Sequence, residues 1–341
     1  MIELIVDVTE AAGLGEPAHL ALSIHLPDPA TMPARPIVCF AKPGGGYSKE
    51  YFTADLLGPG SGAQAEWHAA RGWIFVAVDH LGVGASSTDH DPGALDYTHL
   101  SSAAQAAELE ILDRLAAGCL AEGFPSVINP LRLGIGQSMG GCMTIIQQGR
   151  HHCYDGVGVL GYSAIHTHPP VPPGTDPLVA FWRPRDTLAT TEPLILTNVP
   201  QMAAAARTTA TPGAWADMAW GFHYADVDAE TVRRDMERTE EDWPVWASRT
   251  MPFAVATSCL TPGAVAPEAA AIEAPVLVAM GERDVIADPK GEPRAYLSAR
   301  SVDLFICPRM GHMHNFASTR ELFWERLDSW ATWVGQLAAA R

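Results

Sequence analysis

The chain has 341 residues, of which 48% are hydrophobic and 18% charged, so it can bury a sizeable core and is not globally disordered. Its length suits one large domain or a domain with an insertion. The formal net charge of −17 argues against nucleic acid or an anionic membrane surface as a partner, and we attribute the acidity to solubility.

The first residues, 1–8, lack a basic region followed by an apolar run, so we expect no secretory signal. No apolar stretch approaches the roughly 18 residues that a membrane span needs. The six cysteines stand singly, with no C-x-x-C pair, and we expect them to be reduced and mostly buried. Together these features predict a cytoplasmic protein.

Short β-rich runs alternate with helix-length segments along much of the chain. This alternation predicts a mostly parallel sheet with helices on both faces. The predicted strands are Ala18–His25, Pro36–Phe40, Trp73–Val78, Leu131–Gly136, Gly156–Leu160, Pro275–Met280 and Val302–Cys307. The predicted helices are Ser101–Ala117 and Glu321–Leu337, the second with Phe323, Leu327, Trp330 and Trp333 buried.

The alternation stops between about residues 166 and 272. This stretch opens with a proline-rich segment and holds five of the ten tryptophans. Helix-like segments follow at Val199–Thr208, Ala214–Phe222 and Ala229–Trp246. A separate helical domain is one interpretation, but strand-like segments return afterwards. We therefore favour a helical insertion above the sheet.

The segment Gly136-Gln-Ser-Met-Gly140 follows a predicted strand and precedes a helix-compatible run. At such a junction the flanking glycines let strand and helix approach closely, and the serine takes an unfavourable backbone conformation. Its hydroxyl then projects above the sheet, where the amide of Met139 and the helix N-terminus can meet a developing negative charge. We interpret Ser138 as a nucleophile rather than as an ordinary turn residue.

A serine hydroxyl needs an imidazole to accept its proton and a carboxylate to orient that imidazole. In sheet enzymes of this type the chain order is serine, acid, histidine. Asp284, directly after a predicted strand, is the expected acid. Asp288 and Asp303 are alternatives, although Asp288 also suits a turn before Pro289.

Two histidines compete for the role of base. His312 directly follows Gly311, and His314 lies two residues further on, where a polar loop residue is the alternative interpretation. Together with His166 and His168 these pairs suggest a metal ion. No third ligand stands at a recognisable spacing, so we expect no metal.

Four segments, in this order and strand context, resemble the α/β-hydrolase superfamily over about residues 36–316. They are Asp79–Ser86, Gly136–Gly140, Gly281–Asp284 and Gly311–His312, the first being similar to the family's D-x-x-G-x-G-x-S turn. The resemblance implies an α/β-hydrolase core formed by residues 1–165 and 273–341, with a helical cap domain at 166–272. Some members carry the acid after the preceding strand, but here residues 161–168 contain no carboxylate.

The glycine run after the second predicted strand resembles the family's H-G-G-G loop, with Pro43 in place of the histidine. The resemblance implies that the amides of Gly45 and Gly46, together with that of Met139, form an oxyanion hole. One such donor contributes about 3 kcal/mol to lowering the barrier. A flexible turn is the alternative interpretation of three consecutive glycines.

The resemblance implies a cofactor-free serine hydrolase that acts on carboxylic esters through Ser138, Asp284 and His312 and an acyl-enzyme. C–C bond, lactone or amide hydrolysis and acyl transfer on the same residues are alternatives, as is a non-catalytic ligand-binding protein on this scaffold. Gly134-Ile-Gly136 begins like a dinucleotide fingerprint, but the third glycine falls one residue late. Members that cleave carbon–halogen bonds or epoxides have aspartate, not serine, at this turn.

The insertion is rich in large apolar side chains, and we expect some of them to line an apolar pocket over Ser138. The expected partner is therefore a small, apolar, ester-like molecule, with bulky or aromatic esters preferred over acetate. The expected substrate-binding residues are Tyr47, Trp182, Met218, Trp220 and Phe222. The alternative is that these side chains only pack the insertion onto the core.

Overall fold

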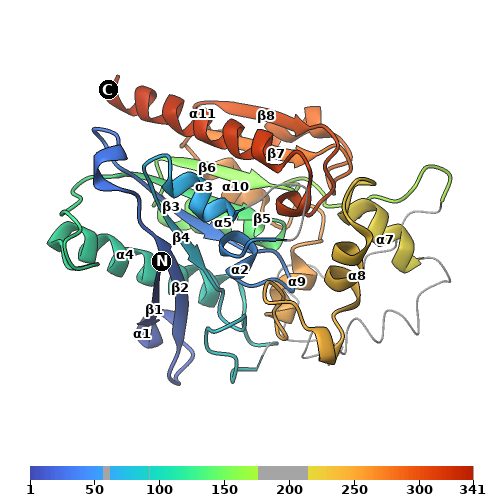
Figure 1. Cartoon of the computed structure of the whole chain (residues 1–341), viewed down its shortest axis with the longest axis horizontal. Helices are drawn as coiled ribbons and strands as arrows, with labels where there is room; N and C mark the ends of the chain where they lie inside the picture. Colours follow the sequence, from blue (N-terminus) through green and yellow to red (C-terminus); the bar gives the residue numbers. More distant parts are fainter. Residues whose placement is uncertain (57–61, 92, 176–213, 341) are drawn as a thin grey trace.

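A computed structural model describes residues 1–56, 62–91, 93–175 and 214–340. Its described strands form one eight-stranded sheet in the order β1-β2-β4-β3-β5-β6-β7-β8 (Figure 1). The pairs β1–β2 and β2–β4 are antiparallel, and all other neighbours are parallel. The strands are β1 Ile2–Asp7, β2 His19–His25, β3 Ile37–Lys42, β4 Trp73–Val78, β5 Leu131–Gln137, β6 Gly156–Leu160, β7 Val276–Gly281 and β8 Val302–Cys307.

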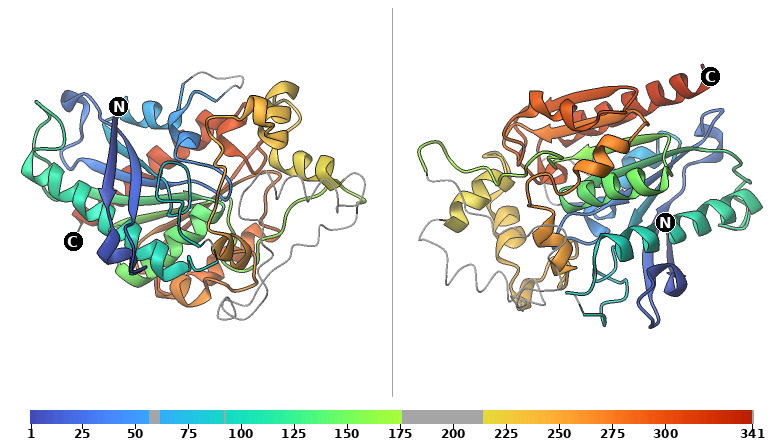
Figure 2. Two further views of the ribbon diagram at one scale, coloured as in Figure 1. Left: turned by 90° about the horizontal axis from the view of Figure 1, so that it is seen from below. Right: turned by 180° about the vertical axis from the view of Figure 1, so that it is seen from behind.

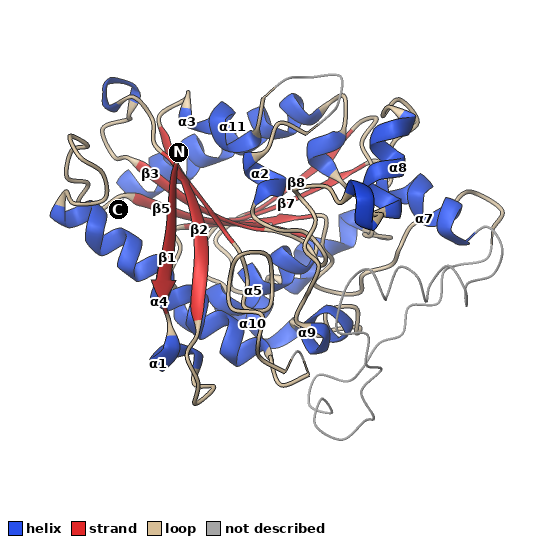
Figure 3. Cartoon of the chain, turned by 60° about the horizontal axis from the view of Figure 1, so that its bottom comes forward, coloured by secondary structure: helices blue, strands red, loops and turns tan. Residues whose placement is uncertain are grey.

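Helices cover both faces of the sheet, as Figure 3 shows. The α-helices are α1 Thr9–Ala12, α2 Glu50–Thr53, α3 Gln64–Ala69, α4 Tyr97–Ala117, α5 Met139–His151, α7 Ala214–Phe222, α8 Ala229–Glu237, α9 Phe253–Ser258, α10 Ala266–Ala271 and α11 Arg320–Ala339. Short 3-10 helices are η1 Pro29–Thr31, η2 Glu240–Asp242, η3 Pro289–Ala295 and η4 His314–Phe316.

The sheet has a hydrophobic core on each face. Alternate side chains of β3 show why, since Val38 and Phe40 enter one core while Cys39 and Ala41 enter the other. Helices α1, α4, α5 and α10 pack on the first face, and α2, α3 and α11 on the second (Figure 2). Both faces of the parallel strands β3 to β7 are thus buried, which explains their nearly continuous apolar sequences, whereas the edge strand β8 is half-buried.

The predicted α/β-hydrolase fold, with its mostly parallel sheet flanked by helices, is confirmed, and all seven predicted strands are present. The edge strand β1 was not predicted; it pairs only with β2, and its Ile5 is 58% exposed, so it lacks the pattern of a buried strand. The six cysteines, all among the described residues, form no disulfide, and all but Cys119 are buried. No described helix combines the length and the apolar character needed to cross a bilayer.

Two helix predictions need correction. Trp333 is not buried: it is 36% exposed, because the inward stripe of α11 runs through Phe323, Leu327 and Trp330 to Val334. Helix α8 ends at Glu237 rather than at Trp246, and the residues after it form η2 and a turn that packs against the loop after β3. The predicted helix Val199–Thr208 lies outside the described residues.

Residues 161–275, which we call the β6–β7 segment, connect two neighbouring strands of the sheet. Its last helix, α10, packs against α5 on the core. The others, α7, α8 and α9, lie beyond one end of the sheet, at the right of Figure 1. Backbone contacts join α7 to the loop after β8 and the residues after α8 to the loop after β3, so this segment reaches the carboxyl ends of the strands.

Candidate active site

Ser138 occupies the sharp turn between β5 and α5 and has φ 54° and ψ −121°, a strained conformation for a residue with a side chain. A Cβ on Gly136 would overlap the carbonyl of Gly140, and one on Gly140 would overlap the carbonyl of Lys42. Only glycine fits these two positions, and the packing around them holds the turn in shape. Ser138 itself is partly exposed.

Asp284 follows β7 and lies against His312, which the loop after β8 supplies. The Nδ1 of His312 is 2.7 Å from Oδ1 of Asp284. The carboxylate also accepts the amides of Gly281 (2.8 Å) and Val285 (2.7 Å). Burial would raise the pKa of Asp284, but the two nearby histidines outweigh it and hold this pKa well below its usual range. The carboxylate is therefore ionised and can fix the tautomer of His312.

The structure brings both candidate histidines onto the same carboxylate. The Nε2 of His314 lies 2.7 Å from Oδ2 of Asp284. Its ring packs on Phe323, with 4.5 Å between centroids, and its Nδ1 is buried without a partner in the described chain. His314 is therefore enclosed, whereas His312 is the histidine whose second nitrogen faces the strand end that carries Ser138.

Gln137, the residue before Ser138, contacts His312 directly. Its side-chain amide donates to the carbonyl of His312 (3.0 Å) and lies 3.3 Å from Nε2 of the same residue. With Nδ1 donating to Asp284, Nε2 of His312 carries a lone pair, the state that a general base needs. Within the described residues, no hydrogen bond joins the Ser138 hydroxyl to His312.

The alternative acids lie elsewhere. Asp288 caps η3, accepting the amide of Gly291, and pairs with Arg294 at 3.0 Å. Asp303 pairs with Arg326 at 2.6 Å. Neither carboxylate contacts a histidine in the described chain. No cluster of three or more potential metal ligands occurs among the described residues either.

The loop after β3, residues 43–47, which we call the glycine loop, passes directly over Ser138. A Cβ on Gly44 would lie 3.1 Å from that of Ser138, and one on Gly45 would lie 3.8 Å from the sulfur of Met139. Gly46 has φ 78°, which favours glycine. In the described structure the amides of Gly45, Gly46 and Met139 donate to no other group, so they are free to bind an oxyanion.

This loop is anchored although it has Pro43 where the related motif has histidine. The Nε2 of His80 donates to the carbonyl of Pro43 at 3.1 Å. Burial lowers the pKa of His80 to about 4, so the ring is neutral. Its neighbour Asp79 accepts the amide of Lys49 at 2.6 Å. The turn that begins at Asp79 therefore fixes both ends of the loop.

Tyr47, predicted to bind substrate, is buried, and its hydroxyl donates to Asp235 of α8 at 2.7 Å. The preceding carbonyl, of Gly46, accepts a hydrogen bond from Arg238 at 2.7 Å. These contacts make Tyr47 a link between the glycine loop and α8. Trp182 lies outside the described residues.

The other three predicted substrate-binding residues lie on α7. Phe222 is half-buried, and its ring centroid is 5.0 Å from that of His312. Trp220 packs against the guanidinium of Arg283, which lies 4.3 Å from its ring centroid. Met218 is partly exposed. Phe222 is thus the member of this group that the structure brings to the candidate site.

Three polar residues that contact the site were not predicted. Gln137 could have been found, because it occupies the variable position before the serine. His80 lies inside the Asp79–Ser86 turn, which resembles the family's D-x-x-G-x-G-x-S turn. Arg238 carries no local signal, since its contact with Gly46 spans 192 residues.

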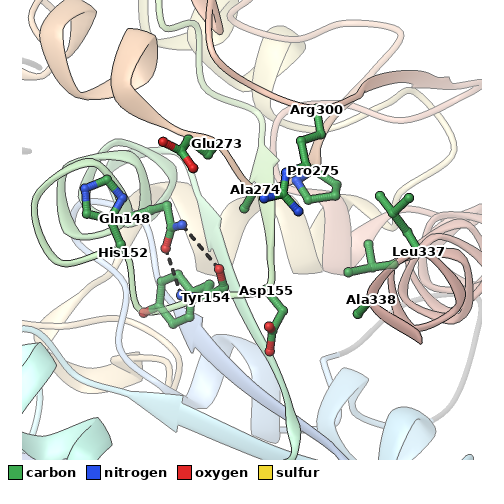
Figure 4. Close-up of a pocket in the computed structure, with 11 residues that line it drawn as sticks. Gln148, His152, Tyr154, Asp155, Glu273, Ala274, Pro275, Arg300, Leu337 and Ala338 are labelled. Carbon is green, nitrogen blue, oxygen red and sulfur yellow. Dashed lines mark hydrogen bonds between the residues drawn. The ribbon is translucent and has the colours of Figure 1, made fainter. Parts of the chain in front are cut away.

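A cavity of about 170 Å³ lies away from these residues (Figure 4). It opens between the C-terminal end of α5, the segments that precede β6 and β7, and α11. Its polar lining residues include His152, Asp155, Glu273 and Arg300. Because it lies at the amino ends of the strands, it is separate from Ser138, which follows the carboxyl end of β5.

The sheet, the strained serine and the acid–histidine pair define the chain as an α/β hydrolase. A family model described as "Alpha/beta hydrolase family" matches residues 37–325, so the chain belongs to that family. A search of curated protein sequences finds no match.

Solved structures with the same fold include VinJ, with a TM-score of 0.60, 16% identity, and coverage of 98% of this chain and 99% of that one. A proline iminopeptidase from Mycobacterium smegmatis is similar, with a TM-score of 0.59, 16% identity, and 99% and 100% coverage. So is a thermophilic esterase from Thermogutta terrifontis, with a TM-score of 0.56, 16% identity, and 97% and 99% coverage. At these identities the likeness concerns the fold alone.

Proposed function

We propose that this protein is a serine hydrolase of carboxylic esters. In the first step Ser138 attacks the ester carbonyl and Nε2 of His312 takes the hydroxyl proton. The amides of Gly45 and Met139 hold the oxyanion, and Asp284 stabilises the charged imidazole. The proton then passes to the leaving alcohol as the C–O bond breaks. A water molecule, deprotonated by His312, releases the acid and regenerates Ser138.

One observation carries the proposal: a strained, partly exposed serine lies beneath a loop with free amides, at the strand ends that also hold a buried Asp284–His312 pair at 2.7 Å. The Gln137 amide is compatible with this chemistry. Its bond to the His312 carbonyl (3.0 Å) is shorter than its contact with Nε2 (3.3 Å), so the amide can stay on the carbonyl while Nε2 accepts the proton.

We further propose that the described helices α7, α8 and α9 act as a cap, and that the substrate is a small apolar ester. The position of Phe222 beside His312 supports this role. An apolar surface near the reacting carbonyl favours apolar acyl or alcohol groups, since ligand sites are mostly apolar with few polar groups.

The test uses an aryl organophosphonate, which forms a covalent bond to an activated serine. We expect intact-mass analysis to show one adduct on the wild type and none on Ser138→Ala, and ester hydrolysis to be lost in that variant. Ser329→Ala, which removes an exposed hydroxyl on α11, should be labelled like the wild type.

Adduct formation in Ser138→Ala, or an unlabelled wild type that hydrolyses esters, would contradict the assignment of the nucleophile. A panel of p-nitrophenyl esters beside a lactone and an anilide then decides the bond type. A higher kcat/KM for the lactone or the anilide would replace the ester assignment while keeping Ser138 as nucleophile.

A further inference from the structure

We propose that Asp235 and Arg238 of the β6–β7 segment are positioning residues for the oxyanion hole. They would fix the direction of the Gly45 amide by holding the next residue, Gly46. This inference rests on the proposed function, because it assigns these residues a part in the same reaction.

Arg238 makes the direct contact. It follows α8 in a left-handed conformation (φ 48°), which turns its side chain onto the glycine loop. Nη1 donates to the carbonyl of Gly46 at 2.7 Å, Nε donates to the carbonyl of Asp235 at 2.7 Å, and the guanidinium lies 4.4 Å from the ring centroid of Tyr47. The side chain is only 9% exposed, so these contacts form largely away from water.

The Gly45 amide is thereby held from both sides. Before it, His80 donates to the carbonyl of Pro43. After it, the carbonyl of Gly46 accepts from Arg238 and also from the amide of Ser248 at 3.0 Å. Two peptide units lie between these fixed carbonyls. The first carries the Gly45 amide, and its own carbonyl, that of Gly44, accepts the amide of Tyr47 at 3.1 Å, which fixes its plane. An oxyanion donor acts only when it is aimed in advance.

Asp235 holds the arginine and the loop together. Its carboxylate is fully buried and accepts from Tyr47 (2.7 Å), His223 (2.9 Å) and Trp246 (2.8 Å), with Nη2 of Arg238 at 3.5 Å. Burial would raise the pKa of Asp235, but His223 and then Arg238 outweigh it, so this pKa is lowered. The carboxylate is therefore ionised.

The same carboxylate connects to the loop that carries His312. Through His223 it holds the C-terminal end of α7, whose Gly221 and Phe222 carbonyls accept the amides of His312 (3.0 Å) and Met313 (2.9 Å). One buried group thus links the loop with the oxyanion donors to the loop with the base, and the spacing between the two loops depends on it.

Stability alone does not account for this cluster. A buried ion pair costs desolvation energy that an apolar packing of equal volume avoids, so such a pair is weak evidence for stability. It does fix geometry, because directional donors meet one acceptor from four elements of the chain. Precise geometry matters at a catalytic centre, where a displacement of about 1 Å can lower the rate about 100-fold.

The experiment compares Arg238→Met, which keeps length but removes the donors, with Arg233→Met as the matched control. Arg233 lies on α8, the helix that Arg238 follows, and pairs at the surface with Glu230, Glu237 and Asp242. For each folded variant we measure kcat and KM on one p-nitrophenyl ester, with active sites counted by phosphonate titration. We also measure the affinity of an alkyl trifluoromethyl ketone, whose serine adduct carries an oxyanion, and that of the product acid.

We expect Arg238→Met to lower kcat about 10- to 100-fold and to keep KM within about twofold of the wild-type value. The affinity for the trifluoromethyl ketone should fall by the same factor as kcat. Affinity for the product acid should not change, and Arg233→Met should match the wild type. If Arg238→Met does not fold, Tyr47→Phe removes one donor to Asp235 with little change in volume. This variant should lower both kcat and the affinity for the ketone about threefold, with KM unchanged.

Unchanged kcat and ketone affinity in a folded Arg238→Met variant would overturn the proposal, as would a rise in KM alone. A lower melting temperature with wild-type kcat would assign the cluster to stability only. These failures concern the positioning residues, since the wild type would still be labelled at Ser138. A wild type that is neither labelled nor active would instead overturn both this inference and the proposed function.

Discussion

Asp284 is shared by two imidazoles, and the two contacts differ in what they permit. His314 donates Nε2–H, and its Nδ1 is buried without a partner in the described chain. Because this second nitrogen has no partner in the described chain with which to exchange a proton, His314 is suited to hold the carboxylate through one fixed hydrogen bond. His312 keeps its Nε2 toward Gln137 and the turn that carries Ser138. In the proposed reaction Asp284 therefore orients His312, which exchanges a proton, and accepts a fixed hydrogen bond from His314.

We predict unequal effects of removing these groups. His312→Ala and Asp284→Asn should each lower the acylation rate about 10³- to 10⁴-fold, because the base or its orienting acid is lost. His314→Ala should lower it about tenfold or less, and His314→Gln, which keeps an N–H donor, should recover part of that loss. Stopped-flow measurement of the nitrophenol burst gives these rates.

Asp288→Asn is the matched control for the acid, since Asp288 pairs with Arg294 at the surface, and it should match the wild type. A greater loss for His314→Ala than for His312→Ala would transfer the role of base to His314. A greater loss for Asp288→Asn than for Asp284→Asn would do the same for the acid.

Asp79 predicts a dependence of stability on pH. Burial, and then the charge of Glu50, raise the pKa of Asp79 to about 7. The backbone amides that donate hydrogen bonds to its carboxylate lower the pKa, but by less. An aspartate in an unfolded chain has a pKa of about 3.9. Between these values the folded state holds a proton that the unfolded state has lost. The contribution of Asp79 to the free energy of unfolding is therefore complete below about pH 3.9 and is lost as pH rises to about 7.

Urea unfolding at several pH values tests this. From pH 4 to pH 7 the wild type should lose stability relative to Asp79→Asn, which cannot titrate. Asp89→Asn, at an exposed position, controls for the loss of a charge, and its curve should run parallel to that of the wild type. Parallel curves for the wild type and Asp79→Asn would show that the native pKa is not raised.

At the scale of elements, the β5–α5 junction depends on close backbone approach. Gly136 and Gly140 each lie where a Cβ would overlap a carbonyl oxygen. Gly335, in contrast, lies within α11, where a Cβ would make ordinary contact with Leu131 at 3.6 Å. The same substitution should therefore have opposite effects at the two kinds of position.

We predict that Gly136→Ala lowers the free energy of unfolding by about 3 kcal/mol, because backbone must shift to admit the methyl group. Gly335→Ala should raise it by about 0.5–1 kcal/mol, because alanine loses less backbone entropy in a helix. Denaturant unfolding measures both values. A stable Gly136→Ala variant would mean that the strand and helix are less closely packed at this turn.

Sequence patterns predicted what is local and repeated. Most of the predicted strands are short buried runs, although β8 is only half-buried, and Asp284 was predicted because it closely follows β7. The resemblance favoured His312 as the base, but spacing alone did not separate it from His314, since both histidines of this loop reach the carboxylate. The contacts of Tyr47 with Asp235 and of Arg238 with Gly46 span 188 and 192 residues. They depend on how α8 returns to the sheet, which no local pattern encodes.

At the scale of the whole molecule, the β6–β7 segment is joined to the core by contacts around the candidate site. Arg283, next to Asp284, lies against the rings of Trp220 and Tyr224, at 4.3 and 4.1 Å from their centroids. On the other side of the candidate site, Arg238 donates a hydrogen bond to the carbonyl of Gly46 in the glycine loop. The segment is thus connected to both loops that border the candidate site, and what it presents there is largely aromatic.

We therefore predict that selectivity lies in this segment. The serine turn and the glycine loop can polarise any ester carbonyl, so discrimination must come from the side chains around them. Phe222, beside His312, should favour bulky or aromatic acyl groups over acetyl.

Phe222→Ala should lower kcat/KM for p-nitrophenyl benzoate about tenfold and change that for p-nitrophenyl acetate about twofold at most. Val245→Ala, 66% exposed in the same segment, should change neither. If acetate is the best ester and Phe222→Ala leaves the ranking unchanged, selectivity does not come from the β6–β7 segment.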